Sequence, residues 1–387
     1  MTTDHRPRVL HVGPLPPSLG GVAAALQMIL RCPALAGFEQ RAFNVFRGGR
    51  PEIAGRKVPT PGRVLRRLAL TTELARQVRH ERPDILHFHF GSESTLDSIG
   101  ALLMMRAGSG AARRTILHVH VDPATADLPG RGALGQRLFR QLTRQVDAIC
   151  VLTDGYREHL LRCAVPQPVS VVPNMCDEQL LALSIERQRG TDGVCVVALG
   201  RLTREKGFFD LLQVATRLGN TRPAIRFEVA GLPASAAEAR RIDEIVESAG
   251  LRECVRLPGA VLGADKTALF ARADVLVAPS YWESFGLTAI EGMAAGLPVV
   301  GTAVAGLKNI IVDQQTGFLV APGDIGAMQR CLTQLAGDSA LRLRMGASGR
   351  QRFLDRYSAA RVGASIATLY QQLLEAPAVP HRRQGVA

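Results

Sequence analysis

The chain contains very little lysine. Of its 47 basic residues only four are lysines, Lys57, Lys206, Lys266 and Lys308, and the other 43 are arginines. Lysine is therefore not the default surface cation of this sequence. Lys206 stands in a glycine-bounded loop after an apolar run, and its presence there needs a specific explanation.

Three further scarcities exclude whole classes of protein. The seven cysteines are odd in number and have no C-x-x-C pair, which argues against a disulfide framework or a zinc-cysteine cluster. No apolar run approaches the roughly 18 residues of a membrane-spanning helix, and the first residues suit a strand better than a secretory signal, so we expect a cytoplasmic protein. Aromatic residues make up 5% and are not interleaved with basic ones, so we predict no nucleic-acid partner.

Basic charge is concentrated in the first half of the chain. The formal net charge is +13, and residues 1–190 hold 25 basic and 16 acidic residues, or +9. The densest part is the segment 63–82, where Pro61 is placed to begin a helix. We expect its apolar residues on one broad side: Val64, Leu65, Leu68, Leu74 and Val78. Such a helix is usually solvated, but it can also lie on an anionic membrane surface.

The length of 387 residues indicates two domains, because single cores rarely grow beyond about 250–300 residues. A strand, a glycine-containing loop and a helix follow one another at residues 8–30 and again at 194–218. Alternating strands and helices imply parallel pairing. We predict an α/β protein of two Rossmann-like domains, residues 1–175 and 176–357, that face each other across a cleft with a hinge near Pro173.

The stretch 279–301 predicts a strand-to-helix connection. An apolar run ends at Pro279, and the pattern over 287–295 is helical until a glycine and a proline end it. The amides of Phe285, Gly286 and Leu287 would then lie at the positive end of the helix dipole without intrahelical partners, where they can hold a phosphate.

Two acids accompany this helix start. Glu283 precedes the predicted helix and Glu291 lies within it, and carboxylates suit hydroxyl groups rather than phosphates. Gly286 lacks a side chain where the backbone would approach a ligand. A solvated helix face explains either acid alone, but together the features indicate a site for a phosphate and a polyol.

Two predicted strands, 85–90 and 115–120, each carry a His-x-His pair. Alternation puts both imidazoles of a pair on one face, so a metal site must be considered. Neither pair has an obvious third ligand in the sequence, and we predict no metal, with His87, His89 and His118 buried and satisfied. His120 is the better functional candidate, because ligands bind where parallel strands end.

Two loops after predicted strands are suited to phosphate. Arg201 and Lys206 are the first and last residues of R-L-T-R-E-K, and the compact ammonium group of the lysine suits a diphosphate oxygen. Gly20 and Gly21 follow the first strand and permit close backbone approach. The G-x-G-x-x-G spacing is absent, so a nicotinamide or flavin fold is not supported.

These motifs resemble those of the retaining family-4 (group 1) glycosyltransferases, which have the GT-B fold. The motifs are E-x7-E with S-F-G-L between the acids, G-R-L-x-x-E-K-G at 200–207 and T-G-F-L-V-x-P-G-D at 316–324. The likeness covers most of the chain and is weakest over 38–80. It implies that a last helix, at about 358–374, crosses back to the first domain.

The resemblance also implies roles. Arg201 and Lys206 would clamp the nucleotide diphosphate, Glu291 would bind the ribose and Glu283 the sugar hydroxyls. The catalytic set would be His120, Glu283, Arg201 and Lys206. The donor-binding set would be Gly21, Arg201, Lys206, Phe285, Gly286, Leu287 and Glu291.

We therefore predict a hexosyltransferase that moves a sugar from a UDP- or GDP-linked donor with retention of configuration and without a metal or cofactor. We expect a glycan or lipid-linked acceptor of envelope or exopolysaccharide synthesis, reached from the inner face of the cytoplasmic membrane, whose anionic surface would be a partner. The alternatives are a nucleotide-sugar epimerase of similar outline, a glycosidase, and a transferase with a soluble acceptor.

Overall fold

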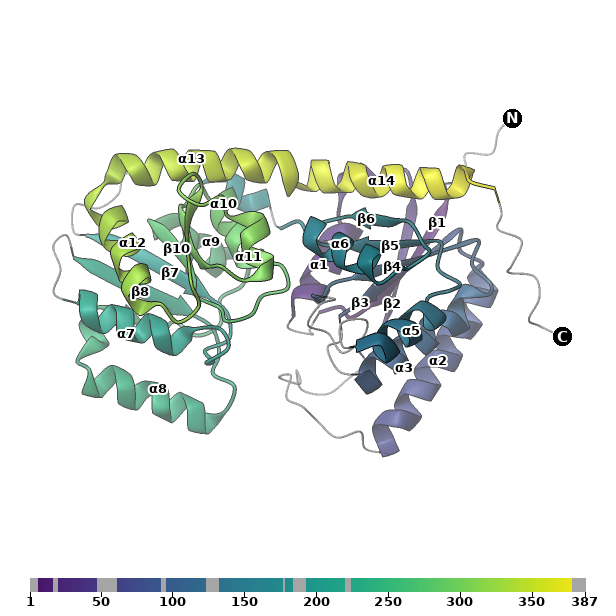
Figure 1. The fold of residues 1–387 in the computed structure, drawn as a ribbon, viewed down its shortest axis with the longest axis horizontal. Helices are drawn as coiled ribbons and strands as arrows, with labels where there is room; N and C mark the ends of the chain where they lie inside the picture. Colours follow the sequence, from purple (N-terminus) through teal and green to yellow (C-terminus); the bar gives the residue numbers. More distant parts are fainter. Residues whose placement is uncertain are drawn as a thin grey trace. The chain divides into compact units, whose positions relative to one another are not determined.

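The computed structural model describes residues 6–16, 20–46, 61–91, 95–122, 132–176, 178–183, 193–219 and 224–377, with only the backbone for 61–64 and 95–97. The chain forms two compact units, Met1–Met175 with Ala359–Ala387, and Cys176–Ser358 (Figure 1). Among the described residues, no helix is both long and apolar enough to cross a bilayer.

The first unit is built on a parallel sheet of six strands in the order β2-β1-β3-β4-β5-β6. The strands are β1 (Arg8–Gly13), β2 (Glu39–Asn44), β3 (Ile85–Phe90), β4 (Arg114–Val119), β5 (Ala148–Val151) and β6 (Val169–Val171). All residues of β3, β4 and β5 are buried, as is typical of parallel strands covered on both faces.

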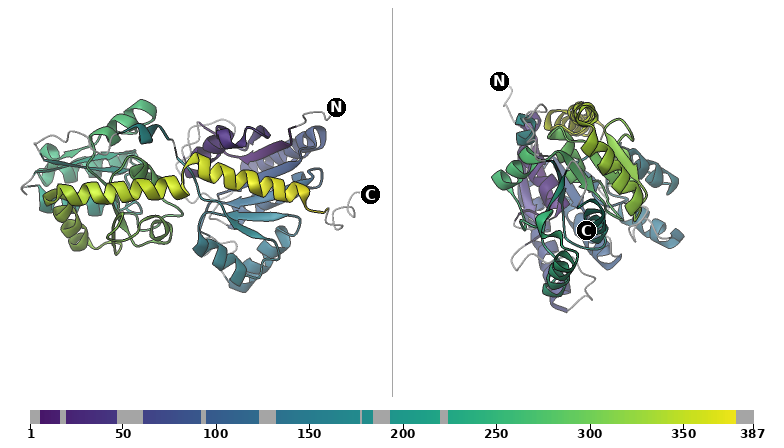
Figure 2. Two further views of the ribbon diagram at one scale, coloured as in Figure 1. Left: turned by 90° about the horizontal axis from the view of Figure 1, so that it is seen from above. Right: turned by 90° about the vertical axis from the view of Figure 1, so that its left-hand side faces the viewer.

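Helices cover both faces of this sheet. They are α1 (Gly21–Leu30), η1 (Pro33–Leu35), α2 (Pro61–Glu81), α3 (Thr95–Ser109), α5 (Gly132–Leu142), α6 (Asp154–Arg162) and α14 (Ala359–Glu375). One core joins Ile29, Ile85 and Ile116 to Ile366 and Tyr370, so α1 and α14 share a face. Figure 2 shows α14, in yellow, lying across the strands. The predicted return of the last helix to the first domain is confirmed.

The predicted apolar side of α2 is wrong in its first half. Leu74 and Val78 are fully buried, whereas Leu65 and Leu68 are 67% and 57% exposed. Leu65 and Leu74 are nine residues apart, which is two and a half turns, so the two side chains face opposite sides of the helix. The side chain of Val64 lies outside the described residues.

The second unit also has six parallel strands, in the order β12-β11-β10-β7-β8-β9. They are β7 (Val194–Leu199), β8 (Ile225–Ala230), β9 (Val255–Arg256), β10 (Val275–Ala278), β11 (Val299–Thr302) and β12 (Gly317–Val320). The helices are η2 (Glu178–Ala182), α7 (Phe208–Leu218), α8 (Ala236–Ser248), η3 (Leu251–Glu253), α9 (Gly263–Arg272), α10 (Leu287–Ala294), α11 (Ala305–Ile310), α12 (Ile325–Gly337) and α13 (Ser339–Arg356).

Strand order fixes where this unit can bind a ligand. The chain runs outward from β7 to β9 on one side and from β10 to β12 on the other. The order therefore reverses between β7 and β10, and open α/β sheets bind ligands at the carboxyl ends of the strands at such a point.

Candidate active site

Two loops meet at the reversal point of the second sheet. The loop after β7 ends at Gly207, which has φ +67, and a Cβ there would lie 2.0 Å from the carbonyl oxygen of Pro279 in the loop after β10. The amide of Tyr281 donates to the carbonyl of Glu205 at 2.9 Å. The Arg201 loop and the Glu283 loop thus form one continuous edge.

This contact brings Lys206 against Glu283. The Lys206 Nζ lies 2.6 Å from Glu283 Oε2, and the Ser280 hydroxyl donates to the same oxygen at 3.3 Å. About a fifth to a quarter of each charged side chain is exposed, at 21% for Glu283 and 25% for Lys206. The residues predicted to hold diphosphate and sugar hydroxyls are therefore in direct contact.

The second acid has a lysine of its own. Glu291, in the second turn of α10, lies 2.8 Å through Oε1 from the Nζ of Lys266 on α9. Both side chains are largely covered, at 13% and 22% exposure. Sequence reasoning gave Lys266 no role, although the scarcity of lysine was a signal that could have found it.

The helix α10 begins at Leu287, the last of the three residues whose amides were predicted to hold phosphate. Gly286 is the residue before the helix, with φ 104 and ψ 58, and Leu287 is the first helical residue. A Cβ on Gly286 would lie 2.6 Å from Leu307 of α11, so backbone and packing require glycine, rather than room for a ligand. Phe285 is buried edge-on against Tyr357, with ring centroids 5.9 Å apart. Of the three, Leu287 has its amide in the first turn, where no intrahelical acceptor exists.

Arg201 is exposed, two residues beyond the end of β7. The pKa of the nearby Glu205 is lowered by its own backbone hydrogen bond and the Thr203 hydroxyl, with the charges of Arg201 and Arg204 adding to the effect. The loop therefore presents guanidinium charge beside the Lys206–Glu283 pair.

Gly21 lies in the first unit, at the corresponding reversal between β1 and β3. It is exposed and is the first residue of α1. A Cβ on the neighbouring Gly20 would meet no atom within 4 Å, so packing does not require that glycine. Gly21 and His120 belong to the first unit, whereas the predicted donor-site residues Arg201, Lys206, Glu283 and Glu291 belong to the second.

His120 belongs to a buried group of five histidines, the histidine cluster, formed with His11, His87, His89 and His118. His11 is in register with His87, and His89 with His118, on neighbouring strands. Adjacent rings are 4.2 to 5.5 Å apart. His11 Nδ1 is 3.1 Å from His89 Nε2, and His89 Nδ1 is 3.0 Å from His120 Nε2.

All five imidazoles are neutral at pH 7. Burial lowers the pKa of His11 and of His118 to about 4, and it lowers the other three pKa values well below 6.5. The expectation of satisfied histidines holds for His89, whose two ring nitrogens both have partners, but it is wrong for His87 and His118, because His87 Nε2 and His118 Nδ1 are buried without a hydrogen-bond partner. Sequence reasoning also missed His11, which lies one strand away from the pair on β3.

Two family models match the chain, one for each half. The model described as "Glycosyltransferase Family 4" matches residues 19–180, and the one described as "Glycosyl transferases group 1" matches residues 185–352. The second match contains both Lys–Glu pairs.

Curated relatives match part of the chain. A glycogen synthase of Mycobacterium tuberculosis is 28% identical over 234 residues, which are 59% of this chain and 55% of the relative. A D-inositol 3-phosphate glycosyltransferase of Corynebacterium urealyticum is 31% identical over 255 residues, 62% of this chain and 59% of the relative. The matched region thus spans little more than half of each relative.

Solved structures share the fold over nearly the whole chain. A sucrose-phosphate synthase from Thermosynechococcus elongatus has a TM-score of 0.75 at 20% identity, covering 96% of this chain and all of that one. Anabaena HepE in complex with UDP has a TM-score of 0.73 at 16% identity, covering 94% of this chain and all of that one. With its two parallel α/β units, the chain has the GT-B fold and belongs to the family-4, group 1 glycosyltransferases.

Proposed function

We propose that the protein transfers a sugar from a nucleoside-diphosphate sugar to an acceptor, with retention of anomeric configuration. The observation that supports this is the pair of Lys–Glu contacts at the reversal point of the second sheet, beside exposed Arg201. A glycosidase would use the two carboxylates but would give Arg201 and Lys206 no task. The relatives named glycogen synthase and D-inositol 3-phosphate glycosyltransferase also favour transfer.

The donor would exchange the contacts of this site. Its diphosphate attracts Lys206 away from Glu283, which is then free to accept hydrogen bonds from the sugar hydroxyls. Glu291, held by Lys266, accepts from the ribose. Charge grows on the diphosphate as its bond to the anomeric carbon breaks, so Arg201, Lys206 and the Leu287 amide stabilise the transition state more than the ground state.

Retention follows from same-face attack in this proposal. The acceptor oxygen approaches on the side that the diphosphate leaves, and a phosphate oxygen takes the acceptor proton, so no protein nucleophile is required. Fixed cations take the place that a divalent ion has in other transferases, and added Mg²⁺ or Mn²⁺ should not change the rate. Gly21 and His120 would contact the diphosphate and sugar, as their family positions imply.

A nucleotide panel tests the donor assignment. Thermal unfolding with UDP, GDP, ADP and their sugars should show one nucleotide that raises the midpoint strongly, with UDP or GDP expected, because a ligand selective for the folded state stabilises it according to its affinity. Product analysis with that donor should show transfer that requires an acceptor. Isomerised donor without acceptor would identify an epimerase instead.

The surface of the first unit supports a membrane-borne acceptor. Leu65 and Leu68 on α2, Leu103 on α3 and Leu134 on α5 are between 50% and 81% exposed. Helix α3 contacts both α2 and α5, so the leucines lie on neighbouring helices. Exposing these leucine side chains to water is unfavourable, whereas at a bilayer interface they can enter the boundary of the acyl chains.

A basic pocket lies along the C-terminal part of α5. It has a volume of about 380 Å³ and is lined by Arg137, Arg140, Gln141, Arg144, Ala164 and Pro166. Three guanidinium groups around one hollow suit a phosphate group, and phosphate is common to lipid headgroups and lipid-linked sugars. We therefore propose that the first unit binds an anionic membrane that carries the acceptor.

A further inference from the structure

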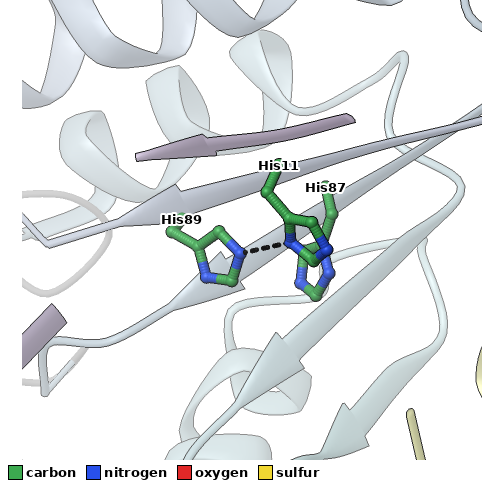
Figure 3. Close-up of side chains that lie close together, drawn as sticks. All are labelled: His11, His87 and His89. Atoms are coloured by element: carbon green, nitrogen blue, oxygen red, sulfur yellow. Dashed lines mark hydrogen bonds between the residues drawn. The ribbon is translucent and has the colours of Figure 1, made fainter. Parts of the chain in front are cut away.

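Three members of the histidine cluster have the spacing of metal ligands. His11, His87 and His89 each offer one ring nitrogen, and these atoms lie within 4.8 Å of one another (Figure 3). The three side chains are at most 4% exposed. His11 Nδ1 and His89 Nε2, 3.1 Å apart, are close to the separation of two nitrogens that share one ion at about 2.0–2.1 Å.

The third ligand is an unsatisfied nitrogen. His87 Nδ1 lies 2.6 Å from the hydroxyl of Tyr370 on α14, which leaves Nε2 for the trio. That Nε2 is buried and has no hydrogen-bond partner. A buried polar atom without a partner destabilises the fold, and a bound ion that accepts its lone pair would remove this cost.

We propose that His11 Nδ1, His87 Nε2 and His89 Nε2 bind one transition-metal ion of the kind that prefers imidazole ligands. The other nitrogen of each ring already has an outer partner, as ligating histidines require. His11 Nε2 lies 3.2 Å from Gln40 Oε1, His87 Nδ1 meets Tyr370, and His89 Nδ1 is 3.0 Å from His120 Nε2. Three ligands and three outer partners are thus in place.

Binding would shift protons without releasing one. When Gln40 Oε1 accepts from His11, the chain of bonds places the protons on Nε2 of His89 and of His120. A metal on His89 Nε2 moves that proton to Nδ1, which then donates to His120 Nε2 and moves the His120 proton to Nδ1. The buried Asn174 Oδ1, which lies beside His120, accepts it.

The absence of a negatively charged ligand in the trio favours a metal ion of low charge. Both candidate trios consist of histidine alone, so no carboxylate among the described residues of the cluster offsets the ion's charge. The cost of burying an ion rises with the square of its charge, which makes a divalent ion about four times as costly as a monovalent one of equal size. Imidazole binds both zinc and copper, so ligand type does not separate the two metals. The lower cost of burying a monovalent ion favours copper(I) over zinc(II).

Only one ion fits. The second trio, His89, His118 and His120, also has nitrogens within 4.8 Å, but it shares His89. A neutral imidazole has one free lone pair, so His89 can serve one trio at a time. In the first trio every ring has an outer partner, with His120 serving His89, and we assign the ion to this trio.

Metal content of the full chain tests the assignment. The ligands are buried, so the protein should be made in medium supplemented with copper or with zinc and the bound metal counted by mass spectrometry. Wild type should hold one ion per chain, His87→Gln should hold almost none, and His118→Gln should keep it. His80→Gln, which changes an exposed histidine on α2, is the matched control.

A conservative variant covers the case in which His87→Gln does not fold. Tyr370→Phe keeps the ring and removes the outer partner of His87, and it should weaken copper(I) affinity, measured by chelator competition, about 10- to 100-fold. Wild type without bound metal, or unchanged binding in Tyr370→Phe, would overturn the proposal. Loss in His118→Gln with retention in His87→Gln would assign the ion to the second trio and refute the first.

Discussion

Each acid of the candidate site has its own lysine, and this pairing decides how substitutions should behave. Removing Lys206 leaves the Ser280 hydroxyl to donate to Glu283 in the loop, beside the proposed diphosphate site. We predict that Lys206→Ala and Arg201→Ala each cost about 2–4 kcal/mol of transition-state stabilisation, seen as lower kcat/KM with unchanged circular dichroism. Lys308→Ala and Arg217→Ala, both exposed, are the matched controls. Normal turnover in a folded Lys206→Ala protein would refute the proposal that Arg201 and Lys206 hold the diphosphate.

Substitutions of Glu283 and Glu291 should have different effects, because the two acids are proposed to bind different parts of the donor. Glu283→Ala should reduce turnover without weakening affinity for the bare nucleoside diphosphate, because its proposed partner is the sugar. Glu291→Ala should weaken that affinity as well, because it loses the ribose contact and the carboxylate that holds Lys266. Isothermal calorimetry measures both. The reverse pattern would exchange the two roles.

One partly buried ion pair gives a pH-dependent prediction away from the site. Arg272 binds Glu228 through two bonds, of 2.8 and 2.6 Å, and this lowers the pKa of Glu228 below 4.5. A depressed carboxyl pKa stabilises the fold above the unfolded pKa, and that stability is lost as pH falls through the folded pKa. Glu228→Gln should therefore destabilise at pH 7, with a smaller difference from wild type below pH 4.5 in urea unfolding. Glu247→Gln, in the exposed pair with Arg252, should change little at either pH.

Residues close together in the sequence were easier to predict than residues brought together by the fold. Glu283 and Glu291 share one helix start, and Lys206 follows one strand, so motif and spacing were enough to single them out. Lys266 contacts Glu291 on another helix, and His11 contacts histidines on another strand. The sequence does not show that these elements are neighbours. The strand order that joins β1 to β3 is needed before His11 becomes part of a cluster.

Three neighbouring helices, α2, α3 and α5, carry the membrane prediction. Wild type should sediment with anionic vesicles at low salt and less at high salt, because each basic residue near the surface contributes about 1 kcal/mol before screening. Leu65→Ser with Leu68→Ser should weaken binding by removing insertion, and Arg137, Arg140 and Arg144 changed to Ser should weaken it by removing charge.

Matched substitutions on the second unit test whether vesicle binding depends on this surface or only on the net positive charge of the protein. Leu262→Ser removes an equally exposed leucine, and Arg240, Arg330 and Arg344 changed to Ser remove equal charge. Both should sediment like wild type. If the wild-type protein stays in the supernatant with anionic vesicles at low salt, the membrane part of the proposal fails and the donor site is unaffected.

Elements with a buried face were predicted closely, and an edge strand was missed. The helical pattern over 208–218 coincides with α7, and the helix expected from Leu287 is α10. β2 has one buried residue, Phe43, because it lies at the edge of its sheet and faces neighbours on one side only. Its sequence, EQRAFN, therefore lacks the apolar run that marked the central strands.

At the scale of the molecule, α14 makes the first unit discontinuous in sequence. Val362, Ile366 and Tyr370 are buried in the core of that unit, with Leu369 and Leu373 beside them. Each contributes about 1.5–3 kcal/mol by burial, and the sum is comparable to the whole stability of a domain. We predict that a chain ending at Ser358 loses cooperative unfolding of the first unit, while the second unit keeps its own transition in calorimetry. A folded first unit in that truncation would contradict this account.

The same discontinuity sets a delay during synthesis. The first sheet is complete once Met175 has been made, but α14 follows only after all of Cys176–Ser358. At about 5–20 residues per second this takes on the order of 10–40 s, in which the face with the five histidines has no cover from its last helix. A small ion could reach ligands during that interval that are closed to it in the finished protein, and Tyr370 would be the last outer partner to arrive.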